Sequence, residues 1–228
     1  MTRRYYQARR RARALLALML LAPSAEALAQ PTSERVVPPA YDTRMPAIDG
    51  GLEIAVAISG AQTTGDIGDG MTADNLIGSA GQLDLEIGHR LTPHLTLGFY
   101  SNAQAFAEGS FGPRDVYTGA AGVEADFHFR PTQAVDPWIS IGTGVRAYLI
   151  EDGNYTIGVG AELARLQVGA DFRLDENVAL GPVLGASASL YGAEKQPMED
   201  FHELADKGIN WTFTAGIAGR FNLLGTRR

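Results

Sequence analysis

The sequence predicts an all-β protein, an eight-stranded antiparallel up-and-down transmembrane β-barrel. Three observations support this prediction. Eight segments alternate apolar and polar residues with a period of two, short turns and long loops alternate between these segments, and an export signal precedes them. Because each apolar face continues along its whole segment, the pattern is typical of strands that face lipid.

Residues 1–29 are predicted to be a signal peptide. Six arginines precede the apolar run 14–22, and Ala27-Leu28-Ala29 offers a cleavage site. The run has about nine residues, too few for a hydrocarbon core that needs roughly 20 helical residues. Residues 30–50 are rich in proline and are expected to form an irregular periplasmic lead-in, so the barrel is assigned to residues 51–223.

The composition limits the partners and the chemistry. Removal of residues 1–29 leaves 13 basic and 25 acidic residues, a formal charge of −12, which argues against nucleic acid as a partner. The chain has no cysteine, so disulfides and thiolate chemistry are excluded. We expect outer-membrane lipid to be the main partner.

The first four predicted strands cover about residues 51–62, 81–91, 94–106 and 116–130. In the first strand, Leu52 and Ile54 lie on one face and Glu53 lies on the other. The polar faces of the second and fourth strands carry Asp84, Glu86, Glu124, Asp126 and His128.

The last four predicted strands cover about residues 138–150, 156–173, 178–191 and 209–221, and their polar faces carry Arg146, Arg165, Asp171, Arg173 and Arg220. The eighth strand alternates most clearly, with Trp211 and Phe213 on its apolar face. Pro182 interrupts the seventh strand. Because proline cannot donate to the ladder, we expect a bulge there.

The connections are of two kinds. Turns are short after the second, fourth and sixth strands, and residues 90–98 align with residues 173–181 as two copies of one hairpin. Longer, glycine- and acid-rich loops cover residues 63–80, 107–115, 151–155 and 192–208. Since outer-membrane barrels turn their short connections to the periplasm, we expect the long loops at the cell surface, where they would present acidic groups to an extracellular ligand.

This layout resembles the small eight-stranded outer-membrane β-barrel proteins, the OmpA-, OmpX- and OmpW-like group, over about residues 50–223. The resemblance implies a location in the bacterial outer membrane. Barrels of this group usually end on an aromatic residue, whereas here Phe221 is followed by seven further residues.

The orientation of the strands decides between two kinds of barrel. A soluble exported barrel that binds a ligand would turn the apolar faces inward. The polar faces, however, combine charges with many small residues, as a crowded lumen requires, so we expect the apolar faces to meet lipid. The predicted lipid-facing residues are Leu52, Ile54, Val56, Phe127, Phe129, Phe172, Trp211, Phe213, Ile217 and Phe221. The predicted charge network of the lumen consists of Glu53, Asp84, Glu86, Glu124, Asp126, His128, Arg146, Arg165, Asp171, Arg173 and Arg220.

Buried charges must be paired, so two pairs are predicted. Closure of the barrel brings Arg220 to Glu53, and Arg146 is expected to meet Glu124 on the neighbouring strand. Such pairs would plug the lumen, because eight strands enclose little more than the volume of their own side chains.

Catalytic and metal-binding patterns are incomplete. Residues 202–206 read His-Glu-Leu-Ala-Asp, which lacks the second histidine of a zinc motif and is expected to form a short helical turn in a loop. Asp66, Asp69 and Asp74 miss the spacing of a calcium loop. We therefore expect no enzymatic activity, no metal and no cofactor. The predicted function is a structural or surface-interaction role in the cell envelope, with a narrow channel or a lateral pathway for small solutes as the alternative.

Overall fold

The computed structural model describes residues 47–68, 70–73, 78–106, 115–151, 155–198 and 200–227. The predicted signal peptide and most of the predicted lead-in lie outside these residues. Within them, no helix has the length and the hydropathy needed to cross a membrane.

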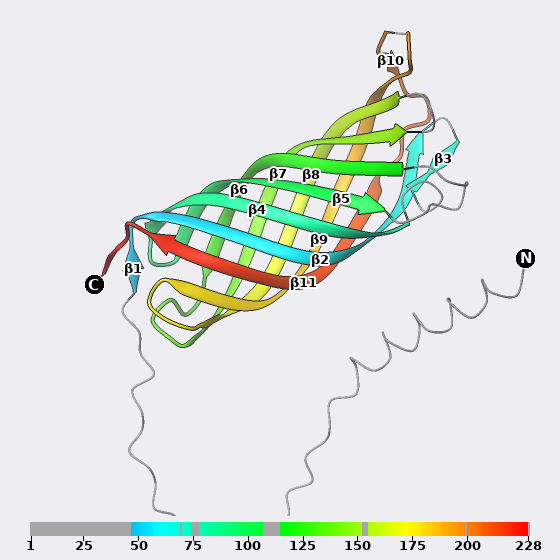
Figure 1. Cartoon of the computed structure of the whole chain (residues 1–228). Coiled ribbons are helices and arrows are strands. Elements are labelled where there is room, and N and C mark those ends of the chain that lie inside the picture. The colour runs from blue at the N-terminus through cyan, green and yellow to red at the C-terminus, as the bar shows by residue number, and fades with distance from the viewer. Residues whose placement is uncertain are drawn as a thin grey trace, which may run out of the picture. The chain divides into compact units, whose positions relative to one another are not determined.

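Eight long strands form one closed antiparallel barrel (Figure 1). They are β2 (Leu52–Gly68), β4 (Ser79–Thr92), β5 (Leu95–Phe106), β6 (Asp115–His128), β7 (Val135–Glu151), β8 (Tyr155–Arg173), β9 (Val178–Lys195) and β11 (Asn210–Leu223). Each pairs with the next, and β11 closes the ring on β2, with Arg220 opposite Ala55. The predicted fold class, strand number and strand order are therefore confirmed.

Four two-residue strands lie at the ends of the barrel (Figure 1). At the end with the short turns, β1 (Ile48–Asp49) pairs with β12 (Thr226–Arg227). At the other end, β3 (Met71–Thr72) extends β2 and β10 (His202–Glu203) extends β9. We call these the short-turn end and the loop end.

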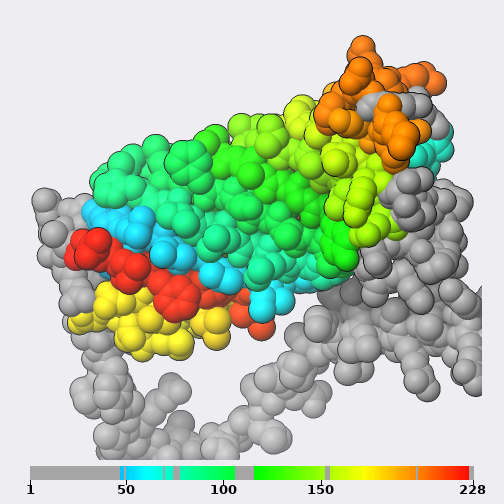
Figure 2. Space-filling model, turned by 45° about the horizontal axis from the view of Figure 1, so that its top comes forward, coloured from blue at the N-terminus to red at the C-terminus, as the bar shows by residue number. Residues whose placement is uncertain are grey.

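Burial alternates along the strands as their period of two requires. Large apolar side chains cover the outside of the wall: Ile58 is 71% exposed and Phe99 70%. On β11, Trp211, Phe213 and Ile217 are also exposed, and Figure 2 shows this strand lying against β2 at the seam. A soluble barrel would bury these side chains, so the described surface is that of a barrel in lipid.

The two similar hairpins close their turns in the same way. The hydroxyl of Thr92 accepts hydrogen bonds from the backbone N–H groups of His94 (3.3 Å) and Leu95 (3.1 Å). At the aligned position, Asp175 accepts from the N–H groups of Asn177 (2.7 Å) and Val178 (2.8 Å). A short polar side chain thus replaces a backbone acceptor in both tight turns.

A bulge in β8 changes which residues face the lumen. Glu162 pairs with Ser189 and Ala164 pairs with Ala188, so one residue of β8 is left without a partner on β9. Both Leu163 and Ala164 are exposed, while Glu162 and Arg165 are both buried. Because the extra residue reverses the alternation, two charges three positions apart point the same way.

The bulge predicted at Pro182 is wrong. The register of β8 and β9 is unchanged from Gly169–Val183 to Phe172–Leu180, on either side of the proline. A second shift lies further along β9, where Val159 pairs with Ala193 and Gly160 pairs with Tyr191. The strand accommodates the missing N–H of Pro182 by leaving a ladder position open rather than by inserting a residue.

Candidate functional site

The lumen near the short-turn end is organised around Glu53. This buried carboxylate accepts hydrogen bonds from Arg90 on β4 and from Arg220 on β11. Arg220 also lies 3.2 Å from Asp126 and 3.1 Å from Asp171. The predicted approach of Arg220 and Glu53 across the seam is confirmed.

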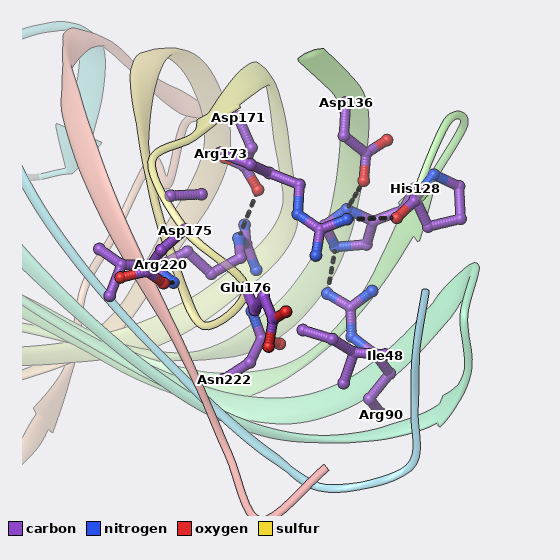
Figure 3. Close-up of a pocket in the computed structure, with 13 residues that line it drawn as sticks. Ile48, Arg90, His128, Asp136, Asp171, Arg173, Asp175, Glu176, Arg220 and Asn222 are labelled. Carbon is purple, nitrogen blue, oxygen red and sulfur yellow. Dashed lines mark hydrogen bonds and ion pairs between the residues drawn. The ribbon is translucent and has the colours of Figure 1, made fainter. Parts of the chain in front are cut away.

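His128 extends this network toward the short turns (Figure 3). Its Nδ1 lies 2.8 Å from an oxygen of Asp136, and its Nε2 lies 3.3 Å from a guanidinium nitrogen of Arg90. Since arginine can only donate, Nε2 is the acceptor and Nδ1 carries the proton toward Asp136. Both ring nitrogens are therefore occupied.

In the middle of the lumen, Arg165 is shared by three carboxylates. It lies 3.1 Å from Asp84, 3.1 Å from Glu86 and 3.3 Å from Glu124. Its guanidinium also stacks over the ring of Tyr100 at 4.2 Å, so one face of this cation is engaged as well as its edges.

The predicted pair between Arg146 and Glu124 is wrong. Arg146 lies 3.4 Å from Glu162, and Glu124 is bound by Arg165 instead. The register explains the difference: Glu124 lies opposite Gly142, whereas Arg146 is four residues further along β7. The bulge in β8 brings Glu162 inward to take the place that we assigned to Glu124.

Three inward-pointing aromatic rings each lie directly opposite a glycine on the neighbouring strand. Tyr100 faces Gly122, Trp138 faces Gly169 and Tyr148 faces Gly158. A Cβ at each of these glycines would collide with the ring. The glycines on the polar faces therefore make room for aromatic side chains that fill the lumen.

The loop end is closed by apolar side chains. The hydroxyl of Tyr148 donates to Glu194, and the ring of Tyr148 belongs to a buried apolar cluster. We call the cluster the apolar plug; it consists of Ile67, Ala73, Val116, Tyr148, Ile150, Tyr191 and Leu204. Residues from the loops beside β3 and β10 thus pack into the mouth of the barrel.

The short-turn end is nearly as full. Ile48 is buried and lines a cavity of about 20 Å³ beneath the β1–β12 pair, beside Arg90 and His128 (Figure 3). A second lumen cavity, between Gln104 and Thr212, measures about 10 Å³. Each of these cavities has room for about one water molecule, so neither is wide enough to serve as a channel for larger solutes.

The structure buries ten of the eleven residues of the predicted charge network inside the barrel. Arg173 is half-buried at the short-turn end, where it donates to the carbonyl of Pro131 (2.8 Å). Of the predicted lipid-facing residues, Leu52 and Ile54 are half-buried and the other eight are exposed.

The predicted charge network left out four charged residues that are buried in the described part of the lumen: Arg90, Asp136, Glu162 and Glu194. The alternation does place Arg90 on the polar face of the second predicted strand, with Asp84 and Glu86. Glu162 lies just before a change of phase in β8 and Glu194 just after one in β9, and the period of two hides both changes.

The structure also corrects the local fold of residues 202–206. His202 and Glu203 form strand β10, not a helical turn, and Leu204 is buried in the apolar plug. Glu203 is exposed and lies 2.5 Å from Lys207, whose hydrogen bond and positive charge lower the pKa of that carboxyl. Asp66 is exposed on β2, whereas Asp69 and Asp74 lie outside the described residues.

No protein-family profile matches the sequence, and no curated protein is similar to it. Several solved structures are similar in fold. Neisserial surface protein A has a TM-score of 0.54 and 12% identity over 76% of this chain and 97% of that chain. Ail of Yersinia pestis, solved with the heparin analogue sucrose octasulfate, has a TM-score of 0.44 and 16% identity over 76% and 100%. OprG of Pseudomonas aeruginosa has a TM-score of 0.45 and 10% identity over 78% and 98%.

The likeness to Neisserial surface protein A agrees with the closed ring of eight strands. This chain has the fold of the small eight-stranded outer-membrane barrels, with a salt-bridged polar interior and an apolar exterior.

Proposed function

We propose that the protein resides in the bacterial outer membrane and has a structural or surface-interaction role in the cell envelope, without enzymatic activity. The observation that carries this proposal is the filled lumen. Each of the four arginines buried in its described part is bound by at least one carboxylate, the two cavities described above have room for about one water each, and both ends are covered by side chains. Such a barrel anchors its loops in the membrane rather than conducting solutes.

The loop end supports the surface-interaction part of this proposal. The segment between β9 and β11 stands at the end of the barrel (Figure 1) and exposes Phe201 by 55%. Asp200, Glu203 and Asp206 are exposed on the same segment. Its mixture of acidic and apolar groups suits a partner at the cell surface better than lipid.

We infer that the protein has no enzymatic activity because its buried histidine, His128, is already engaged on both ring nitrogens. A general base needs a free nitrogen within reach of a nucleophile, but both nitrogens of His128 are held by Asp136 and Arg90.

Membrane residence and conduction are tested separately. The protein should leave isolated envelopes only with detergent and should migrate differently on gels before and after heating, as folded membrane barrels do. Liposomes that contain the refolded chain should take up small sugars no faster than empty liposomes, with a 16-stranded porin as the positive control. Complete release without detergent would contradict membrane residence, and large stable conductance in planar bilayers would contradict the filled lumen.

A narrow channel or lateral pathway is the second candidate, and one observation favours it. A hollow of about 750 Å³ on the wall is lined by the outward Val145 and Val159 together with the inward Asn102 and Arg146. Gly119 and Gly160 also line this hollow, and neither contributes a side chain to fill it. Uptake of small apolar solutes by these liposomes, without uptake of sugars, would favour this candidate.

A further inference from the structure

The buried carboxylates of the lumen outnumber its cations. Among the described residues, four arginines and one histidine are buried. Nine carboxylates are buried with them: Glu53, Asp84, Glu86, Glu124, Asp126, Asp136, Glu162, Asp171 and Glu194. An excess of negative charge in a closed interior is costly unless protons or cations balance it.

Six of the nine carboxylates use both oxygens. Glu53, for example, binds Arg220 with one oxygen and Arg90 with the other. Glu162 receives Arg146 on one oxygen and the hydroxyl of Tyr100 on the other. Asp84, Asp136, Asp171 and Glu194 are likewise bonded through both oxygens.

The remaining three carboxylates each use only one oxygen in the described structure. Glu86 is bound at Oε1 by Arg165. In the orientation of the Gln167 amide that gives both its oxygen and its nitrogen a partner, the nitrogen also donates to Oε1 of Glu86 (3.1 Å). Glu124 is bound at Oε2 by Arg165 and by the hydroxyl of Ser140. Asp126 is bound at Oδ2 by Arg220, and its Oδ1 is buried without a hydrogen-bond partner.

These same three residues converge. One oxygen of each of Glu86, Glu124 and Asp126 lies within 4.8 Å of the other two, and all three residues are buried. Glu86 comes from β4 and the other two from β6, so the cluster forms only when both strands have paired with β5. Two oxygens on opposite sides of one Ca²⁺ are about 4.8 Å apart, at a Ca–O distance of about 2.4 Å.

We propose that Glu86, Glu124 and Asp126 bind one divalent cation, of the Ca²⁺ type, in the middle of the lumen. Carboxylate oxygens are the ligands that hard cations prefer, and Ca²⁺ tolerates the irregular geometry of three side chains from two strands. The cation would complete the coordination of Asp126 and offset the excess charge around Arg165 and Arg220. This proposal does not depend on the role of the protein in the envelope.

Calcium titration of the full mature chain, folded in detergent after metal-free purification, tests the proposal. Calorimetry should give one Ca²⁺ per chain, and the unfolding temperature should rise with millimolar CaCl₂ and fall with a chelator. Asp126→Asn and Glu124→Gln should each weaken Ca²⁺ binding by at least about tenfold, because each removes a charged ligand. Glu194→Gln is the matched control, since Glu194 is equally buried and uses both oxygens elsewhere; it should bind Ca²⁺ as the unaltered chain does.

Two results would overturn the proposal. If the unaltered chain binds no Ca²⁺ at millimolar concentration and its unfolding temperature ignores the metal, the three carboxylates hold protons instead. If Ca²⁺ binds but neither Asp126→Asn nor Glu124→Gln weakens it, the metal lies on the exposed acidic loops. The titration of the unaltered chain decides the first question even where one variant fails to fold.

Discussion

The lumen is filled in two different ways along its length. Toward the short-turn end, Arg220 is shared by Glu53, Asp126 and Asp171, so each of these charges depends on the others. Toward the loop end, the apolar plug packs side chains such as Leu204 without charge. The difference teaches which end tolerates substitution more easily. Loss of one arginine leaves several buried carboxylates unpaired, whereas a side chain of the plug can be shortened at the cost of a cavity.

Arg220→Met should have the largest effect of the changes considered. It leaves Glu53 with one arginine and removes the only arginine that contacts Asp126 and Asp171 among the described residues. Breaking a buried network in this way costs about 3–5 kcal/mol of unfolding free energy. Guanidinium unfolding of the detergent-folded chain measures the loss.

Arg130→Met is the matched control for this change, because Arg130 is an exposed arginine at the short-turn end. It should leave the unfolding midpoint unchanged. A loss below about 1 kcal/mol in the Arg220 variant would mean that the charge network does not hold the short-turn half together.

Leu204→Ala tests the other end and should cost less. Leu204 is 2% exposed, and its truncation leaves a cavity in the apolar plug. We expect this cavity to lower the unfolding free energy by about 2 kcal/mol. Because Leu204 lies in a loop, we expect the loss to appear mainly as faster proteolytic cleavage within residues 200–209. Leu224→Ala, at a residue 91% exposed, should leave the cleavage rate unchanged. Equal rates for both variants would show that the plug does not fasten this loop.

The comparison of the two ends also shows what the sequence could predict. The strands, their outward faces and the contact between Arg220 and Glu53 follow from a period of two and from closure of the ring, both of which are visible in the order of residues. The apolar plug was not predicted, because Ile67 and Leu204 belong to segments whose side chains follow no period.

Register limited the prediction inside the lumen. A single extra residue in β8 turns Glu162 inward and gives Arg146 a different partner, and no local pattern marks that residue. Likewise, the free oxygens of Glu86, Glu124 and Asp126 depend on which side of each carboxylate an arginine approaches. Such geometry appears only when strands distant in the chain are placed together.

Gly158→Ala should have the smallest effect that is still measurable. The new Cβ would enter the ring of Tyr148, which lies opposite on β7 and is held by the bond from its hydroxyl to Glu194. The ring must tilt, and we expect the unfolding free energy to fall by about 1 kcal/mol, at the low end for overpacking, because the other side chains of the apolar plug can shift. Gly81→Ala is the control, since a Cβ there meets nothing within 4 Å. A Gly158 variant as stable as the Gly81 variant would show that the loop end repacks freely, and the contrast with the charged half would then be larger than the structure suggests.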